Sequence, residues 1–441
     1  MSSKDQKQEL NPRTKSFEFL GPPGATLITI GVPSMIYTLY FACSEASGGC
    51  PAPGLFSDPS ALLERVSSAL SSPEWWASLW DTEATIIYFA WYAFCIVAWA
   101  ILPGDWVEGT TLRTGGKQKY KINAFSTYFL TLGLVTGWIL RFGPESFTFI
   151  YEKWLGFVTA SLLNSVIQAV YSYASSYRSG ALLALGGNSG NFIYDFYIGR
   201  ELNPTIGSLD LKSFNELRPG LILWVLVDIS MVCEQAVRRG GLNHVTDSIW
   251  LVLAFHAWYV GDGIYNEPAL FTTMDITTDG FGWMLSVGDL AWVPFVYSLQ
   301  ARYLAFKQVE LGPVWATAIF LTNATGYYIF RTANNEKDHF RNGKNPKNLK
   351  SMDTKRGTKL LISGWWGLCQ HPNYLGDLLM GLSWSLPTGF NTPITYFYVT
   401  YFLVLLAHRQ TRDDEACEKK YGEDWKKYKK LVPYRIFPYI Y

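Results

Sequence analysis

The sequence predicts an all-α polytopic membrane protein with about ten transmembrane helices and a partly polar, cytosol-facing C-terminal lobe. Two observations lead to this class. Hydrophobic residues make up 49% of the 441 residues and aromatic residues 16%. They gather in long apolar runs separated by polar loops, and runs of about 18 or more apolar residues are typical of membrane-spanning helices.

The expected helices follow these apolar runs along the chain. Some runs are short or contain Asp, Glu or His, so the number of transmembrane helices is predicted to within one or two. The predicted spans are residues 25–43, 85–102, 124–140, 154–173, 220–237, 248–260, 281–299, 313–330, two within 360–390, and 393–407.

We expect a polar cytosolic N-terminus over residues 1–24 and a single membrane domain over residues 25–441. The polar N-terminus and the missing small-residue cleavage site after 25–43 are typical of a signal anchor, not of a cleaved signal peptide. Residues 313–441 form the more polar half of this domain. This half holds most of the candidate functional residues.

The distribution of charge predicts the orientation in the membrane. Basic residues concentrate in the N-terminus, in 103–121 and in 331–359, and basic loops favour the cytosolic side. The intervening segment 44–83 is acidic and rich in Ser, Gly and Pro. Both termini are therefore expected in the cytosol. The net charge of +1 gives no sign of a nucleic-acid partner.

The six cysteines show no spacing typical of a metal site, and no metal is expected. Cys43 and Cys50 flank the predicted lumenal loop. The sequence leaves open whether they form a disulfide there or stay as free thiols.

A first candidate site is the basic segment 330–341. Lys337 and Arg341 are four residues apart, so on a helix they share a face. Such a pair can bind a phosphate, with the guanidinium acting as a planar fork. The alternative is ordinary positive charge on a cytosolic loop.

A second candidate site is the polar run 363–377, which interrupts an apolar stretch. His371, Asn373, Tyr374 and Asp377 follow one another closely, and Pro372 favours a helix boundary. A broken helix at the membrane exposes backbone groups that suit a polar ligand. The alternative is a re-entrant hairpin whose polar groups satisfy one another.

A third candidate site is the segment 408–428. Arg409, Asp413 and Cys417 recur every four residues, and an aromatic row of Tyr421, Trp425 and Tyr428 follows. The alternative is a solvated charged helix, which has little need of such a row.

A fourth candidate site lies in residues 259–289, where Tyr259, Tyr265, Asp275 and Asp289 stand in apolar surroundings. An acid in such a setting can donate a proton. The alternative is a set of structural hydrogen bonds at helix ends. Because the sequence contains no Walker loop and no G-x-G-x-x-G, a bound dinucleotide would not sit in a Rossmann domain.

Taken together, these residues resemble the sterol reductase family. Residues 360–441 resemble its C-terminal signature, which the C-14, C-7 and C-24(28) sterol reductases share with the lamin B receptor. Further blocks at 191–204, 217–221, 272–276 and 288–300 are similar to the family as well, so the resemblance covers nearly the whole chain. Residues 10–13 and 17–21 look most like the fungal C-14 reductases.

The resemblance implies a multi-pass enzyme of the endoplasmic reticulum membrane that uses NADPH. The implied reaction reduces the sterol C14=C15 double bond in ergosterol-type sterol biosynthesis, by protonation of the alkene and hydride transfer to the carbocation. The sterol would enter from the bilayer, so its partners are the substrate and membrane lipid.

The resemblance also assigns roles to individual residues. It implies Asp413 and a tyrosine, Tyr259 or the nearby Tyr265, for the proton relay, and we choose Tyr259. Gln370 departs from the family, which often has Arg before the His. The implied cofactor-binding residues are Lys337, Arg341, Trp365, His371, Asn373, Tyr374, Asp377, Arg409, Tyr421 and Tyr428.

Other functions remain as alternatives at this point. The double bond could be that at C-7 or C-24(28), because no motif marks the sterol pocket. Residues 371–374 are also similar to membrane isoprenylcysteine methyltransferases, which bind S-adenosylmethionine. A chromatin tether lacks its added domain here, and a transporter lacks an evident inverted repeat.

Overall fold

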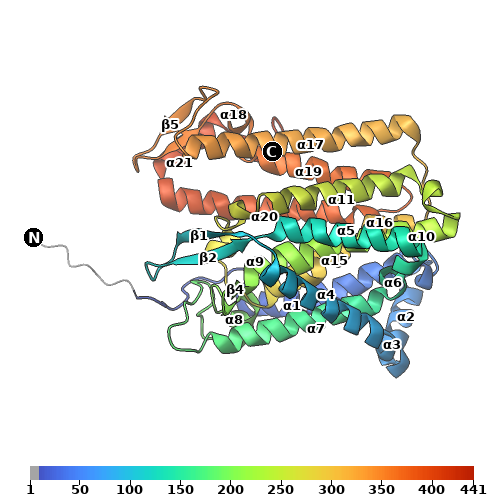
Figure 1. Cartoon of the computed structure of the whole chain (residues 1–441). Helices are drawn as coiled ribbons and strands as arrows, with labels where there is room; N and C mark the ends of the chain where they lie inside the picture. Colours follow the sequence, from blue (N-terminus) through green and yellow to red (C-terminus); the bar gives the residue numbers. More distant parts are fainter. Residues whose placement is uncertain (1–8) are drawn as a thin grey trace, which may run out of the picture. The chain divides into compact units, whose positions relative to one another are not determined.

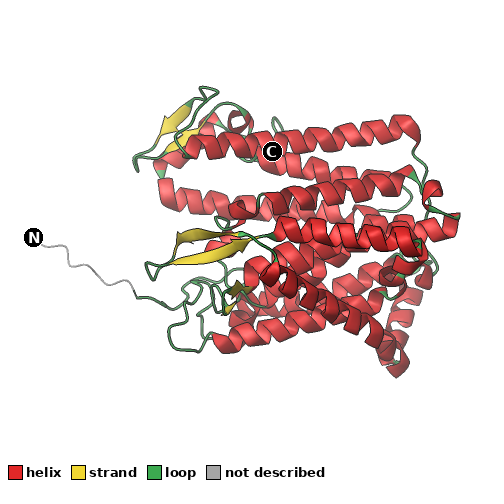
Figure 2. Ribbon diagram, viewed as in Figure 1, coloured by secondary structure: helices red, strands yellow, loops and turns green. Residues whose placement is uncertain are grey.

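The long apolar runs fold into helices whose ends fall close to polar or helix-breaking residues. In the computed structural model, which describes residues 9–441, helices dominate and strands occur as short hairpins (Figures 1 and 2). The first eight residues of the predicted N-terminal segment lie outside this range. Within the described residues, five helical segments are long and apolar enough to cross a membrane: Gly21–Ala42, Pro73–Ile101, Ala124–Phe142, Trp154–Ser175 and Leu211–Arg239.

The chain divides into two compact units. One holds the described residues up to Val245 together with His256–Gln308, and the other holds Thr246–Phe255 together with Val309–Tyr441. The long helix α11 (Asp247–Tyr265) contributes to both.

The first unit contains the five membrane-length segments and two π-helical turns. Its elements are α1 (Gly21–Ala42), α2 (Pro59–Ser71), α3 (Pro73–Ser78), α4 (Thr82–Ile101), β1 (Asp105–Thr111), β2 (Lys117–Ile122), α5 (Ala124–Phe142), α6 (Phe149–Glu152), α7 (Trp154–Ser175), α8 (Phe192–Ile198), β3 (Thr205–Ile206), β4 (Leu209–Asp210), α9 (Leu211–Asn215), α10 (Leu221–Arg239), α12 (Glu267–Leu270), α13 (Met274–Thr277), α14 (Trp283–Val287), α15 (Val293–Val296) and α16 (Leu299–Phe306).

The predicted span 281–299 is not one regular helix. It divides into α14, a π-helical turn at Gly288–Trp292, α15 and α16. Pro294 explains part of the break, because proline has no N–H group to donate within a helix. A second π-helical turn, Glu216–Gly220, contains Pro219 and precedes α10 in the same way.

A disulfide joins Cys43 to Cys50, directly after α1. Of the two possibilities that the sequence left open, the structure therefore has the paired form.

The second unit is built around three long helices and one hairpin. Its elements are α17 (Gly312–Arg341), β5 (Ser351–Asp353), β6 (Lys359–Leu361), α18 (Trp365–Leu368), α19 (Pro372–Ser385), α20 (Phe397–Tyr421) and α21 (Glu423–Leu431). Helix α19 packs against both α17 and α20, and α20 packs against α21 (Figure 1).

Two expectations differ from the structure in this unit. The run 360–390 was expected to hold two spans, but it holds β6, the short α18 and one longer helix, α19. The class all-α also omitted the antiparallel pairs β1–β2, β3–β4 and β5–β6. The helical class of membrane protein is otherwise as predicted.

Candidate functional site

A backbone contact between two helices sets the position of the site. Gly326 on α17 and Gly376 on α19 face each other so closely that a Cβ atom on Gly376 would lie 2.6 Å from the carbonyl oxygen of Gly326. Neither position has room for a side chain. Because α17 and α19 pack this tightly, the last turns of α17 lie beside the start of α19.

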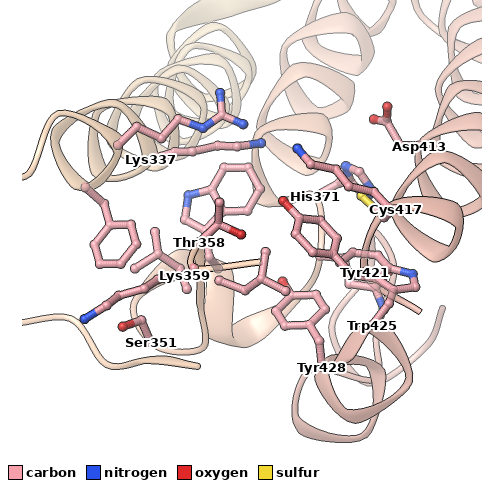
Figure 3. Close-up of a pocket in the computed structure, with 18 of the residues that line it drawn as sticks. Lys337, Ser351, Thr358, Lys359, His371, Asp413, Cys417, Tyr421, Trp425 and Tyr428 are labelled. Atoms are coloured by element: carbon pink, nitrogen blue, oxygen red, sulfur yellow. The ribbon is translucent and has the colours of Figure 1, made fainter. Parts of the chain in front are cut away.

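A cavity of about 960 Å³ lies at this end of the second unit (Figure 3). Its walls come from α17, the β5–β6 hairpin, α18, α20 and α21. The lining residues are Lys337, Phe340, Arg341, Gly343, Asn345, Ser351, Gly357, Thr358, Lys359, Leu360, Leu361, Trp366, Gln370, His371, Asp413, Cys417, Lys420, Tyr421, Trp425 and Tyr428.

Lys337 and Arg341 bring positive charge to one wall. The segment that carries them is the last part of helix α17, so their spacing of four places them on one face. The ammonium of Lys337 lies 4.2 Å from the ring centroid of Trp366. Burial, and then the neighbouring charge of Arg341, lower the pKa of Lys337 to about 8.

An aromatic ladder forms another wall. The rings of Tyr421 and Trp425 are stacked with centroids 6.3 Å apart, and those of Trp425 and Tyr428 at 4.8 Å. The indole N–H of Trp425 donates a 2.6 Å hydrogen bond to Asp414, which fixes the ring. A flat heterocycle can stack on such a surface.

Polar and aromatic groups meet where α19 begins. The rings of His371 and Tyr374 stack with centroids 4.7 Å apart. The Tyr374 hydroxyl donates a 3.3 Å hydrogen bond to Oδ2 of Asp413 on α20. His371 and Asp413 line the cavity, and Tyr374 contacts both without being among the lining residues.

The β5–β6 hairpin contributes a wall that the sequence reasoning missed. Met352 and Leu360 pack on the cluster of Trp425 and Tyr428, and the N–H of Lys355 donates a 2.7 Å bond to Asp424 on α21. The turn contains Gly357, whose φ of 76° is in the left-handed region. A Gly among polar residues between two short alternating segments was the available signal.

The structure brings together about half of the predicted residues of this unit. Lys337, Arg341, His371, Asp413, Tyr421 and Tyr428 all line the cavity. Trp365, Asn373, Tyr374, Asp377 and Arg409 are not among its lining residues. Trp366 lines it instead of Trp365, whose ring packs against Tyr328 at 6.3 Å.

Tyr259 belongs to the first unit and lies near a buried ionisable pair. Its ring is 6.1 Å from that of Trp224, and Trp224 contacts His256. Nδ1 of His256 is 2.8 Å from Oδ2 of Asp228, and neither side chain has any exposed surface. By contrast, Tyr265 is 68% exposed.

Sequence reasoning missed the Asp228–His256 pair. The available signal was an ionisable residue inside each of two apolar runs, 220–237 and 248–260, because such residues are costly in a membrane and are often functional. Among the residues that the structure describes, no group of three or more His, Cys, Asp and Glu side chains is arranged to hold a metal ion.

Comparison with known proteins gives a consistent result over the full length. Residues 13–441 match the model of the "Ergosterol biosynthesis ERG4/ERG24 family". The chain is 48% identical to the Delta(14)-sterol reductase erg24 of Schizosaccharomyces pombe over 96% of this chain and 97% of that protein. It is 44% identical to ERG24 of Candida albicans, over 99% and 100%, and 44% identical to ERG24 of Saccharomyces cerevisiae, over 98% and 99%.

Proposed function

The chain belongs to the ergosterol biosynthesis ERG4/ERG24 family, and from this premise we propose that it is a Δ14-sterol reductase that uses NADPH. The membership confirms the family predicted from the sequence. The similarity to three proteins named Delta(14)-sterol reductase, at 44–48% identity over nearly their whole length, carries the proposal.

The cavity of the second unit fits NADPH in three respects. Lys337 and Arg341 offer cations to phosphate groups, and the ladder of Tyr421 and Tyr428 offers flat surfaces to a heterocycle. A volume of about 960 Å³ is in the range of cofactor sites. We therefore assign the residues 313–441 as the cofactor half of a single membrane domain.

We assign five further residues to the proposed cofactor site, although they are not among the residues that line the cavity. Tyr374 supports this role, because it stacks on His371 and bonds Asp413. The other four remain predictions from the family resemblance. They are Trp365, Asn373, Asp377 and Arg409.

The proposed chemistry needs an acid, because a carbon–carbon double bond without an electron-withdrawing group is a poor acceptor of hydride. Protonation at C15 leaves a tertiary cation at C14 of the sterol, and NADPH, when bound, supplies the hydride that quenches it. We assign Asp413 and Tyr259 to the proton relay. The fully buried Trp224, whose ring lies 6.1 Å from that of Tyr259, would help to keep water away from the cation.

The proposed location is the endoplasmic reticulum membrane, with about ten spans and both termini in the cytosol. The disulfide between Cys43 and Cys50 supports this orientation. Disulfides persist in oxidising compartments such as the lumen, so the loop after α1 would be lumenal and the N-terminus cytosolic. A sterol would then enter from the bilayer.

The experiment that tests the function is an assay of the purified protein in detergent with NADPH and a Δ8,14-sterol. We expect a product with two more hydrogens and a saturated C14–C15 bond. A Δ7-sterol and a C24(28)-unsaturated sterol serve as matched substrates. Reduction of one of these in place of the Δ8,14-sterol would assign the enzyme to the C-7 or the C-24(28) double bond instead. Methyl transfer from S-adenosylmethionine without NADPH use would contradict the proposal.

A further inference from the structure

The side chain of Gln410 on α20 is fully buried, and neither its Nε2 nor its Oε1 has a hydrogen-bond partner. Buried amides are nearly always bonded, because an unpaired donor or acceptor loses its hydration without compensation. An amide left with both atoms unpaired therefore suggests a missing partner that carries both a donor and an acceptor.

Gln410 lies on the face of α20 that forms the cavity. Asp413 and Cys417 line the cavity, and they follow Gln410 by three and seven residues, which places all three on one helical face. Gln410 is thus the next position of this face beyond Asp413. The cavity residue Lys420 is ten residues further on, about 15 Å along the helix axis.

The direction of α20 indicates which end of a dinucleotide would reach Gln410. His408 and Arg409 directly precede Gln410, and the residues before them on the same helix, 402–407, are apolar and include the buried Phe402 and Leu406. The cations Lys337, Arg341 and Lys420 stand around the cavity itself. Phosphates belong with these cations, so the redox-active ring, which must meet a sterol from the membrane, belongs on the side of Gln410.

We propose that Gln410 binds the carboxamide of the nicotinamide ring, with Nε2 donating to its carbonyl oxygen and Oε1 accepting from its amino group. The inference rests on the proposed use of NADPH. A nicotinamide carboxamide has the donor and the acceptor that the Gln410 amide lacks, in the matching planar arrangement. The pairing would fix the orientation of the ring.

A second glutamine provides the matched control. Gln370 is 4% exposed and lines the cavity, and its Nε2 donates a 3.0 Å bond to the carbonyl oxygen of Val432. Its Oε1 has no partner. In Gln370 one N–H is thus bonded to the protein backbone, whereas in Gln410 neither amide atom is bonded.

The test measures binding of NADP⁺ and its 3-acetylpyridine analogue by titration calorimetry of the full-length protein in detergent. The analogue keeps the carbonyl oxygen but has a methyl group in place of the amino group. For the wild type we expect the analogue to bind about tenfold more weakly, since Oε1 of Gln410 would stay unpaired. In Gln410→Met the two ligands should bind within about twofold of each other.

Gln370→Leu should weaken the binding of both ligands and keep the tenfold difference between their affinities. If Gln410→Met does not fold, Gln410→Leu makes the same test, with folding checked by thermal unfolding. A tenfold difference that persists in the Gln410 variant would overturn the inference, as would its loss in Gln370→Leu. If the wild-type protein binds NADP⁺ and the analogue equally well, the inference on Gln410 is wrong but the proposed cofactor stands. If it binds neither ligand, the proposal that the protein uses NADPH is wrong as well.

Discussion

The hydroxyl group of Tyr374 donates a 3.3 Å hydrogen bond to Oδ2 of Asp413, and this bond joins the start of α19 to the middle of α20. The ring of Tyr374 also stacks on His371. One tyrosine thus holds in place two residues that line the cavity. The bond engages Oδ2 of Asp413 and leaves Oδ1 to other partners.

Replacing Asp413 tests the proposed acid. We expect Asp413→Asn to lower kcat for sterol reduction by about 100-fold or more, because the amide cannot supply the proton. The Kd for NADPH, measured by calorimetry, should change by less than about threefold. Tyr374→Phe is the control, because it removes the 3.3 Å hydrogen bond to Asp413 but keeps the carboxylate. This variant should lower kcat by less than tenfold. Near-normal turnover of Asp413→Asn would show that another group is the acid.

The affinity for NADPH should depend on pH through Lys337. Burial lowers the pKa of this amine to about 8, so it loses its charge at a lower pH than an exposed lysine. A phosphate binds the charged form, and the affinity should therefore fall as the pH rises through 8. Between pH 7.5 and 9.5 we expect the Kd for NADPH to rise by about tenfold.

Lys337→Arg provides the control for this pH dependence, because a guanidinium stays charged over the whole range. Its Kd should vary little between pH 7.5 and 9.5. The groups that act on Lys337 are Arg341 on its own helix and Asp413 and Cys417 on α20. An equally steep rise of the Kd in Lys337→Arg would assign the titration to another group.

The contact of α17 with α19 should tolerate no added methyl group. A Cβ on Gly376 would lie 2.6 Å from both the carbonyl oxygen of Gly326 and the backbone nitrogen of Phe330. We expect Gly376→Ala to lower the free energy of unfolding by about 1–3 kcal/mol, seen as a lower Tm in detergent. Gly133→Ala on α5 is the control, because a Cβ there meets no atom within 4 Å. The changes in Tm of the two variants relative to the wild type should differ in sign or size. Equal Tm values would argue against the close contact between α17 and α19.

The unpaired amide of Gln410 should reduce the stability of the ligand-free protein. Replacing it by Met removes two buried groups without hydrogen bonds, so we expect the free energy of unfolding to rise by about 1–2 kcal/mol. Gln235→Met is the matched control. Gln235 is equally buried, but its Nε2 donates a 2.7 Å bond to the carbonyl oxygen of Leu304. Its replacement should lower the Tm, and a fall of similar size in Gln410→Met would mean that its amide is bonded after all.

The sequence predicted most of the long helices closely. The run 124–140 corresponds to Ala124–Phe142 and the run 154–173 to Trp154–Ser175. Hydropathy was less informative at 281–299, because it records burial and not the backbone bonds that Pro294 removes. Hydropathy did not indicate β5 and β6 either, because each strand has three residues, and the signal for this hairpin was the Gly among polar residues in its turn.

The site was predictable where its residues share one helix. The spacing of Lys337 and Arg341, and that of Asp413 and Tyr421, suffices to place each pair on one face. Spacing could not decide between Trp365 and Trp366, which are adjacent. Nor could it pair Asp228 with His256, because residues 28 positions apart meet through tertiary packing. The unpaired state of Gln410 depends on its neighbours in space and has no sequence signal.

Sterol profiling of cells that lack this protein tests the central claim most directly. If the protein reduces the C14=C15 bond, these cells should accumulate sterols with Δ8,14-diene nuclei, and the gene for the wild-type protein should restore the normal profile. Asp413→Asn should fail to restore it although the variant protein accumulates in the membrane. Accumulation of sterols that retain instead a C-7 or C-24(28) double bond, with no Δ8,14-diene, would contradict the account.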